Sequence, residues 1–373
     1  MSRYVPPSGQ EWETIEPQDA GFDPVKLAQV AAFHVANESE WPRSMYHPNG
    51  EYVGTAYIQE KPPFNEVIGP VSERGPPAGM LLKGGRVVSQ WGDVARPDMT
   101  FSVAKSFLGI LAGLALERGL IRSLDDRAAD YALDDGFSGP HNSAITWRHL
   151  LQQTSEWEGT LWSKPDAVDR NRQAGPGASN ARKGEERELR PPGSHWEYND
   201  VRVNRLSLSL LQVFRRPLPE VLNEAIMEPI GAKGWEWRGY RNSTVEIDGR
   251  PMESVSGGGH WGGGLFIPTT VLARVGLLIQ RGGEWNGRQL VSQDWIAQMC
   301  EPCAANPVYG FMWWLNTQRR LYPSAPESSV FALGAGNNLI WLDPEHDTVL
   351  VVRWIHKEKI DGLLATTLAA IRG

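Results

Sequence analysis

The 373-residue sequence has only 2 cysteines, and its longest apolar run, residues 107–116, is too short to cross a bilayer. So few cysteines exclude a disulfide-dense secreted scaffold. Basic residues are also in the minority, because 37 Lys and Arg face 44 Asp and Glu and leave a net charge of −7. This balance argues against a nucleic-acid partner.

The N-terminal segment, residues 1–18, lacks the apolar stretch that a signal peptide needs. We therefore expect a cytoplasmic, soluble protein with no membrane partner. The chain is long enough for one large domain or two ordinary ones with a hydrophobic core.

Tryptophan is unusually frequent, with 16 residues against 10 Phe and 9 Tyr. Its ring buries a large area, and its indole N–H needs a partner when it is buried. In periodic segments we expect Trp to pack in the core, as at Trp295, Trp341 and Trp354. Those near loops and glycine-rich turns are instead predicted to wall an apolar pocket: Trp157, Trp162, Trp196 and Trp261, with Trp313 and Trp314 as the next candidates.

Strand patterns occur at both ends of the chain. Apolar runs flank Gly84-Gly85 within residues 79–92, and two more, 337–342 and 348–355, flank a turn, so each pair predicts a β-hairpin. Helical patterns between and beside them cover residues 24–37, 103–116, 144–153, 202–215, 217–229, 268–282, 291–300 and 361–371. This order indicates one α+β unit that is closed by its termini.

Residues 163–193 are polar, highly charged and rich in Gly and Pro, which indicates a long surface loop. A loop of this length inside a compact domain is often a functional lid. A solvated insertion without a role is an equally good interpretation.

The strongest chemical signal is a Ser-x-x-Lys sequence, Ser102 to Lys105, at the start of the apolar helix. The spacing puts both side chains on one helix face, one turn apart. A helix N-terminus favours a developing oxyanion, and apolar surroundings lower the pKa of a lysine, which could then take the serine proton. The alternative is a serine N-cap followed by a surface lysine.

Two further segments carry groups suited to the same chemistry. In PGSHWEYND, residues 192–200, a buried Tyr198 beside a lysine could move protons, and an amide could hold Lys105 or a substrate carbonyl. In the turn from Leu333 to Asn337, small residues would let a substrate lie along a strand edge, with a backbone N–H aimed at an oxyanion.

Two other motifs have less specific meanings. The glycine-rich stretch 257–264 contains G-x-G-x-x-G but lacks the surrounding βαβ unit of a dinucleotide site. Its glycines either bring backbone to a cleft lined by His260 and Trp261 or form a tight structural turn. Cys300 and Cys303 have no further ligands at a useful spacing, so we expect reduced structural thiols and no metal site.

Together these elements resemble the penicillin-recognising serine hydrolases: Ser-x-x-Lys on a buried helix, Pro-Gly-x-x-x-x-Tyr-x-x, and a Gly-rich turn before a terminal hairpin and helix. The chain is most similar to class C β-lactamase-like esterases and amidases, which include 6-aminohexanoate-dimer hydrolases. The resemblance extends from about residue 79 to the end and implies a β-lactamase/transpeptidase-like α+β fold. That fold has an antiparallel sheet flanked by helices and a second, helical domain.

We expect the sheet domain in residues 1–115 and 232–373 and the helical domain in residues 116–231, with the active site in the cleft between them. The resemblance makes Ser102 the acylated nucleophile, Lys105 its base and Tyr198 the partner that shuttles protons. The N–H groups of Ser102 and Ala335 would form the oxyanion hole, within a third motif that comprises Gly334, Ala335 and Gly336.

The sequence departs from the family pattern in two places. The usual Tyr-x-Asn is Tyr198-Asn199-Asp200, so either Asn199 or Asp200 would take the role of the amide near the substrate. The third motif lacks the basic residue that binds the carboxylate of penicillins. This absence favours a small ester or amide as the substrate.

We therefore expect a serine hydrolase that cleaves a small ester or amide through an acyl-enzyme on Ser102, with no cofactor. A homo-oligomer is compatible with the sequence. One alternative is a β-lactamase or a penicillin-binding D-Ala-D-Ala peptidase that uses the same residues. The other is a catalytically silent binding module on the same fold.

Overall fold

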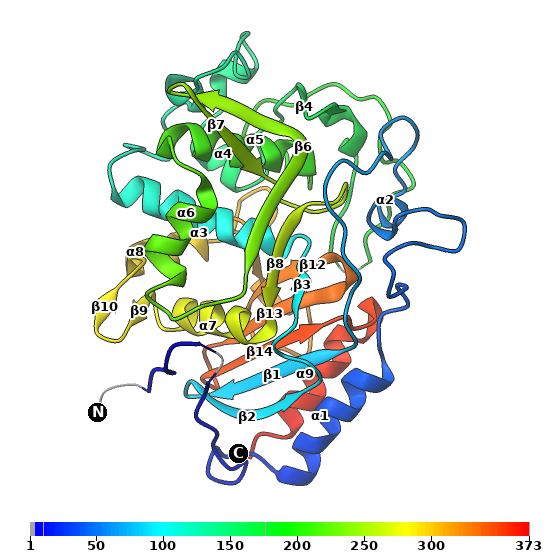
Figure 1. Ribbon diagram of the computed structural model, residues 1–373, viewed down its shortest axis with the longest axis vertical. Helices are drawn as coiled ribbons and strands as arrows, with labels where there is room; N and C mark the ends of the chain where they lie inside the picture. Colours follow the sequence, from blue (N-terminus) through cyan, green and yellow to red (C-terminus); the bar gives the residue numbers. More distant parts are fainter. Residues whose placement is uncertain (1–3, 10, 176, 373) are drawn as a thin grey trace.

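A computed structural model describes residues 4–9, 11–175 and 177–372, and its centre is a six-stranded sheet (Figure 1). The strand order is β11-β12-β13-β14-β1-β2, and each neighbouring pair is antiparallel. These strands are β1 (Ala78–Lys83), β2 (Arg86–Trp91), β11 (Trp314–Leu315), β12 (Val330–Gly334), β13 (Asn338–Asp343) and β14 (Thr348–Arg353). Because β14 pairs with β1, the two ends of the chain meet in the sheet, as the sequence predicted.

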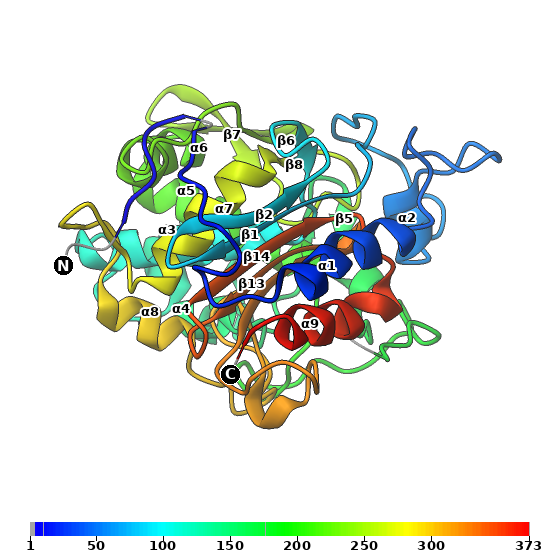
Figure 2. The same ribbon diagram turned by 90° about the horizontal axis from the view of Figure 1, so that it is seen from below.

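Helices cover both faces of this sheet (Figure 2). On one face, α1 (Pro24–Ala36) and α9 (Ile360–Ala369) pack against each other. On the other, α7 (Thr269–Gln280) and α3 (Val103–Glu117) contact the central strands. Side chains alternate along β14, so Val349 and Val351 belong to the cluster around α3 and α7, while Leu350 and Val352 belong to the cluster around α1 and α9.

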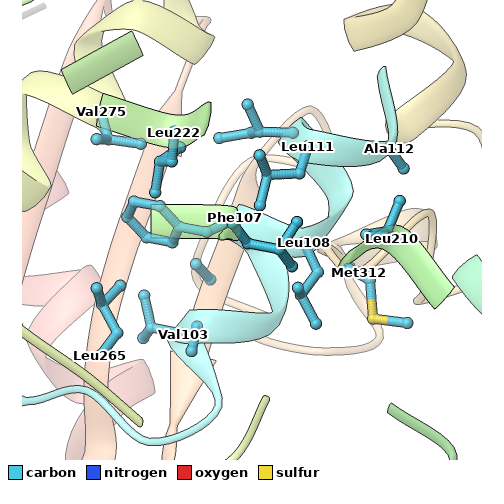
Figure 3. Packing of buried hydrophobic residues seen from close by; sticks show 14 of the residues in the cluster. Val103, Phe107, Leu108, Leu111, Ala112, Leu210, Leu222, Leu265, Val275 and Met312 are labelled. Atoms are coloured by element: carbon cyan, nitrogen blue, oxygen red, sulfur yellow. The ribbon is translucent and has the colours of Figure 1, made fainter. Parts of the chain in front are cut away.

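The helix α3 is central because its sequence is apolar on nearly every side. Figure 3 shows Val103, Phe107 and Leu111 reaching side chains from several other elements. Its glycines allow close approach: a Cβ at Gly113 would lie 2.3 Å from the ring of Trp295. The predicted buried helix is therefore confirmed, and it carries Ser102 at its start.

A second, four-stranded sheet has the order β3-β8-β6-β7, and α5 (Asp200–Phe214) contacts both its strand β7 and α3. Its strands are β3 (Pro97–Met99), β6 (Glu236–Ile247), β7 (Arg250–Val255) and β8 (Gly264–Pro268). The sequence did not predict the long β6–β7 hairpin, because charged residues interrupt the apolar pattern of both strands. In the structure, the pairing of the two strands has a register shift.

The remaining helices are shorter than predicted in two places. Residues 144–153 form only one turn at Trp147–Leu151, and residues 217–229 divide into an α-turn and a π-turn. These and the other helices are α2 (Val53–Tyr57), α4 (Trp147–Leu151), α5 (Asp200–Phe214), α6 (Leu218–Leu222), the π-turn Asn223–Met227 and α8 (Gln293–Met299). Two-residue ladders join β4 (Thr160–Leu161) to β5 (Lys164–Pro165) and β9 (Glu284–Trp285) to β10 (Arg288–Gln289).

The predicted α+β class with antiparallel sheets and flanking helices is confirmed. Trp295, Trp341 and Trp354 are fully buried, as their periodic segments predicted. Within the described residues, no helix has the length and apolar character needed to span a membrane. The domain boundaries at residues 115 and 231 stay a prediction.

Candidate active site

Ser102 is the residue that precedes α3, and Lys105 follows one helical turn later. Lys105 Nζ lies 2.7 Å from Ser102 Oγ, and both side chains belong to buried residues. The Ser102 hydroxyl does not cap the helix, because it makes no hydrogen bond to the N–H groups of the first turn. The Ser-x-x-Lys spacing therefore brings the two groups together, and the interpretation as an N-cap with a surface lysine is wrong.

The surroundings of Lys105 differ from the apolar environment that the sequence predicted. Asp200 Oδ1 lies 2.5 Å from Lys105 Nζ, and the carbonyl oxygen of Gly257 accepts a hydrogen bond from the same nitrogen at 3.2 Å. The carboxylate also contacts Arg172 at 2.7 Å and His260 at 3.0 Å. Burial raises the pKa of Asp200, but Arg172, Lys105 and His260 outweigh it and hold that pKa well below its usual range.

Asn199 and Asp200, the two candidates for the amide of the usual Tyr-x-Asn, point to different places. The Asn199 side chain accepts hydrogen bonds from Val201 and Arg202 and caps α5, and its amide donates to the carbonyl of Asp166 at 2.9 Å. It is fully buried, and its hydrogen bonds go to partners other than Lys105. Asp200 therefore occupies the position beside the lysine, with a carboxylate in place of the family's amide.

Tyr198 also lies close to Lys105 and lines the cleft described below. Lys105 Nζ is 4.8 Å from the centre of its ring, and the guanidinium of Arg172 is 5.2 Å from the same centre. The ring stacks on Trp314 with a centroid distance of 5.8 Å. Two cations therefore face a tyrosine ring whose orientation is fixed by packing.

The backbone N–H groups of Ser102 and Ala335 are the two predicted donors to an oxyanion, and within the part of the chain that the structure describes both are unpaired. Neither Ser102 nor Ala335 donates its N–H to another of the described residues. The two segments touch, since a Cβ at Gly334 would lie 3.2 Å from the Ser102 nitrogen and 1.9 Å from the carbonyl oxygen of Thr100. Gly336 has a different role: it does not line the cleft, its φ is +69°, and it packs against the ring of Trp354.

The glycine-rich stretch 257–264 connects β7 to β8 and passes next to the lysine. A Cβ at Gly258 would lie 2.8 Å from Asp200 Oδ1 and 3.2 Å from Lys105 Nζ, so this position requires glycine. His260 lines the cleft, and burial lowers its pKa against the opposing effect of Asp200. The glycines thus bring backbone to the site, which is one of the two alternatives left open by the sequence.

A cleft of about 490 Å³ opens over Ser102. Its aromatic lining residues, called the aromatic wall below, are Tyr57, Tyr198, Trp314 and Tyr322. The lining also includes the end of β12 with the turn after it and several polar residues, namely Leu333, Gly334, Ala335, Asn337, Asn338, Lys357, Glu358 and Asp361. The cleft is therefore partly polar, unlike the apolar pocket that the sequence predicted.

The four tryptophans predicted to wall this cleft do not line it. Trp157 and Trp261 are buried and donate to the carbonyls of Gly136 and Phe64, at 2.6 and 2.9 Å. Trp162 packs against the main core, and Trp196 lies behind Tyr198 against Trp314. Of the second group of candidates, Trp314 lines the cleft and Trp313 is buried in the core.

Arg172 is the site residue that sequence reasoning missed. It comes from the 163–193 loop, its side chain is 4% exposed, and its guanidinium bridges Asp200 and Asp169. Nothing in its local sequence distinguishes it from the other arginines of the loop. The loop is neither solvated throughout nor detached, because residues 172–175, 177, 178 and 180 form a wall of the cleft.

Neither cysteine forms a disulfide, and burial raises the pKa of Cys300 to about 11, as expected for an unreactive thiol. Glu156, His195 and Glu197 lie close enough to share a metal ion. However, Arg187 lies 2.6 Å from Glu156 and 2.8 Å from Glu197, and Arg202 lies 2.8 and 3.1 Å from the same two residues, so two arginines already balance the two carboxylates. The donor set fits a salt-bridge network rather than a metal centre.

Comparison with known proteins identifies the fold. A solved structure from Bacillus anthracis, described as a 6-aminohexanoate-dimer hydrolase, is 19% identical with a TM-score of 0.57, over 79% of this chain and 78% of that one. An octameric penicillin-binding protein homologue from Pyrococcus abyssi is 17% identical, TM-score 0.57, over 85% and 74%. A D-stereospecific amidohydrolase from Streptomyces sp. is 15% identical, TM-score 0.52, over 75% and 89%.

None of the curated proteins compared with the chain matches it. At the identities of the solved structures, the likeness establishes the fold and leaves the substrate open. A family model described as Beta-lactamase matches residues 80–359, which include Ser102, Lys105, Tyr198 and the third motif, Gly334 to Gly336. This chain therefore belongs to the beta-lactamase family.

Proposed function

We propose that the protein is a serine hydrolase that cleaves a small ester or amide through an acyl-enzyme on Ser102. One observation carries the proposal: Lys105 Nζ lies 2.7 Å from Ser102 Oγ at the base of a cleft. A nucleophile and a basic nitrogen within hydrogen-bond reach, both held by packing, are the arrangement that acyl transfer requires.

In the first half-reaction, Ser102 Oγ bonds to the substrate carbonyl carbon, and the serine proton passes to the amine form of Lys105. The tetrahedral intermediate then expels the alcohol or amine, which takes up that proton. In this proposal the N–H groups of Ser102 and Ala335 stabilise the negative oxygen, a contribution of about 3 kcal/mol for one such donor.

In the second half-reaction, water attacks the acyl carbon and gives its proton to a base, and the carboxylic acid leaves while Ser102 regains its proton. The candidates for that base are the amine form of Lys105, 2.7 Å from Ser102 Oγ, and the phenolate form of Tyr198, which would take the water proton and then return a proton to Ser102. Tyr198 lines the cleft, and Lys105 lies beneath the Tyr198 ring. We therefore assign to Tyr198 the role of the base that takes the proton of the water.

The cleft favours a substrate without a carboxylate next to the scissile bond. The strand end that carries the basic residue of penicillin-binding relatives has Leu333 and Gly334 here. Among the residues that the structure describes, two of the Lys and Arg type line the cleft: Arg172 is already paired with two carboxylates, and Lys357 is next to Glu358 in the sequence. The aromatic wall suits an apolar acyl or leaving group.

Several fold relatives have names that fit this chemistry, including the 6-aminohexanoate-dimer hydrolase, the D-stereospecific amidohydrolase and a hydrolase with promiscuous acyltransferase activity. The homologue from Pyrococcus abyssi is octameric. A homo-oligomer of this chain stays a prediction, which size-exclusion chromatography with light scattering can check.

A substrate panel tests the proposal. Purified protein and Ser102→Ala are assayed on p-nitrophenyl esters of two to eight carbons, acylated anilines, linear amides and nitrocefin. We expect turnover of esters or amides by the wild type, loss of that turnover in Ser102→Ala, and little turnover of nitrocefin. Efficient nitrocefin hydrolysis would favour the β-lactamase alternative, and a flat profile across the panel would favour the silent binding module.

A further inference from the structure

We propose that Asp200 is a positioning residue for Lys105 and that Arg172, carried by the 163–193 loop, holds Asp200 in that position. The loop then determines the state of the base that activates Ser102. This inference rests on the proposed function, because it concerns the same nucleophile and base.

The surroundings of Lys105 match an ammonium group. An ammonium has three N–H donors, and Nζ donates to Ser102 Oγ at 2.7 Å and to the Gly257 oxygen at 3.2 Å. Asp200 Oδ1 lies 2.5 Å from Nζ as an ion-pair partner and accepts no hydrogen bond from the described residues. In the resting enzyme, Lys105 is held with one N–H aimed at the serine oxygen, and it must release a proton before it can accept one.

A carboxylate at position 200 differs from the amide of the family pattern in two respects. It only accepts hydrogen bonds, whereas an amide presents a donor as well, which would face the Lys105 ammonium. It also carries a charge, and an anion within about 4–6 Å favours the charged form of a lysine. Asp200 therefore holds Nζ in place by charge, with Oδ1 2.5 Å from the lysine nitrogen.

Arg172 limits how strongly that anion acts on Lys105. Its Nη1 lies 2.7 Å from Asp200 Oδ2 and 3.2 Å from Asp169 Oδ2, and its Nη2 lies 3.0 Å from His260 Nε2. Asp169 in turn accepts a hydrogen bond from the backbone N–H of Asp200 at 2.8 Å. Arg172 thus shares the carboxylate of Asp200 and is itself fixed between two acidic residues.

The charge network continues into the loop and beyond it. Lys183 lies 3.4 Å from Asp169 and 2.9 Å from Glu60, and the side chains of Lys183 and Glu60 are 3% and 4% exposed. Charges therefore alternate from Glu60 through Lys183, Asp169, Arg172 and Asp200 to Lys105. These ion pairs connect the segment around Glu60, the 163–193 loop and the start of α5 to the start of α3.

The groups that face Lys105 define its pH response. They are Asp200 at the start of α5, Tyr198 before it, His260 from the β7–β8 connection, Arg172 from the loop and Ser102 on its own helix. Removing the charge of Asp200 and removing Arg172 should shift the pH midpoint of Ser102 labelling in opposite directions. If both residues had a purely structural role, neither change would shift that midpoint.

The test measures the rate at which a fluorophosphonate labels Ser102 between pH 5 and 10. In this reaction the serine oxygen bonds to phosphorus, fluoride leaves, and the serine proton passes to the base. In Asp200→Asn we expect the midpoint of the rising limb to fall by about one pH unit or more. In Arg172→Gln we expect it to rise, and in Arg172→Lys we expect it to return toward the wild-type value.

Asp134→Asn is the matched control, because Asp134 pairs with the buried Arg205 at 2.8 Å outside the site, and its midpoint is expected to match the wild type. If Arg172→Gln does not fold, as judged by circular dichroism, Asp200→Asn decides alone. An unmoved midpoint in folded Asp200→Asn overturns this inference while labelling of the wild type leaves the proposed function intact. Absence of labelling at Ser102 in the wild type overturns the proposed function itself.

Discussion

At the scale of single residues, the neighbours Asn199 and Asp200 have different roles at the site. Both follow Tyr198, yet one side chain caps α5 and the other lies 2.5 Å from Lys105 Nζ. A cap residue has extended backbone and turns its side chain to the first helical N–H groups. The next residue begins the helix and points elsewhere, in this case toward the lysine.

The tryptophans allow a prediction that separates packing from binding. Trp314 lines the cleft and stacks on Tyr198, whereas Trp157 is buried and hydrogen-bonded to Gly136 away from it. We expect Trp314→Leu to raise the KM for an aromatic ester several-fold, since it removes part of the aromatic wall. Trp157→Phe should lower the Tm and leave KM unchanged, as steady-state kinetics and thermal melts would show.

The opposite pattern, with KM changed by Trp157→Phe and not by Trp314→Leu, would contradict this placement of the cleft. The error in the sequence-based prediction has a physical source. Nearness to a charged loop says nothing about which way a ring points, and an indole N–H finds a buried carbonyl as readily as a ligand.

At the scale of elements, the close contact between β12 and the segment before α3 forms the proposed oxyanion hole. A Cβ at Gly334 would lie 1.9 Å from the carbonyl oxygen of Thr100, a backbone atom that cannot move alone. We expect Gly334→Ala to push β12 away from Ser102 and to lower kcat/KM by about a hundredfold, comparable to the loss of an oxyanion donor.

Gly362→Ala in α9 is the control for this substitution. There an added Cβ would lie 2.9 Å from the tip of the Phe33 ring, which is a side-chain atom that can shift. This variant should retain the wild-type kcat/KM. Equal activity of Gly334→Ala and Gly362→Ala in the ester assay would rule out the proposed placement of the oxyanion hole.

The packing of α1 on β2 makes stability depend on pH. The Trp91 indole N–H donates to His34 Nδ1 at 2.8 Å, so this nitrogen must stay unprotonated, and burial lowers the pKa of His34 to about 4. The unfolded chain binds the proton near pH 6.5, before the folded protein does. The free energy of unfolding should therefore fall as pH drops from about 6.5 to about 4, by about 3 kcal/mol at most.

His34→Gln keeps an acceptor for Trp91 and removes the titrating group. In urea unfolding at a series of pH values, we expect a smaller loss of stability between pH 6.5 and 4 than in the wild type. If the two proteins lose the same free energy over this range, His34 is not the residue responsible.

Over the whole molecule, much of the fold follows from local pattern. The two hairpins of the main sheet and its terminal helix were predictable because apolar alternation, tight turns and helical periodicity agree there. The β6–β7 hairpin was not, since Glu236, Arg238 and Arg241 interrupt its apolar pattern. Burial of those strands comes from α5 and β8, which lie elsewhere in the sequence.

The residues of the candidate site were also predictable only in part. Ser102 and Lys105 were predictable because helical spacing alone brings them together. Arg172 was not, because its partner Asp200 is 28 residues away and the contact exists only once the charged loop has folded onto α5. Long-range ion pairs of this kind depend on tertiary structure, and composition records only that the charges are present.

The central claim is that Ser102 becomes acylated, and intact-protein mass spectrometry with peptide mapping tests it most directly. Wild-type protein and Ser102→Ala are incubated with a fluorophosphonate probe, and the modified peptide is sequenced. The account predicts one adduct per chain on the peptide that contains Ser102, and no adduct on Ser102→Ala. An unmodified wild-type protein, or an adduct that persists in Ser102→Ala, would contradict it.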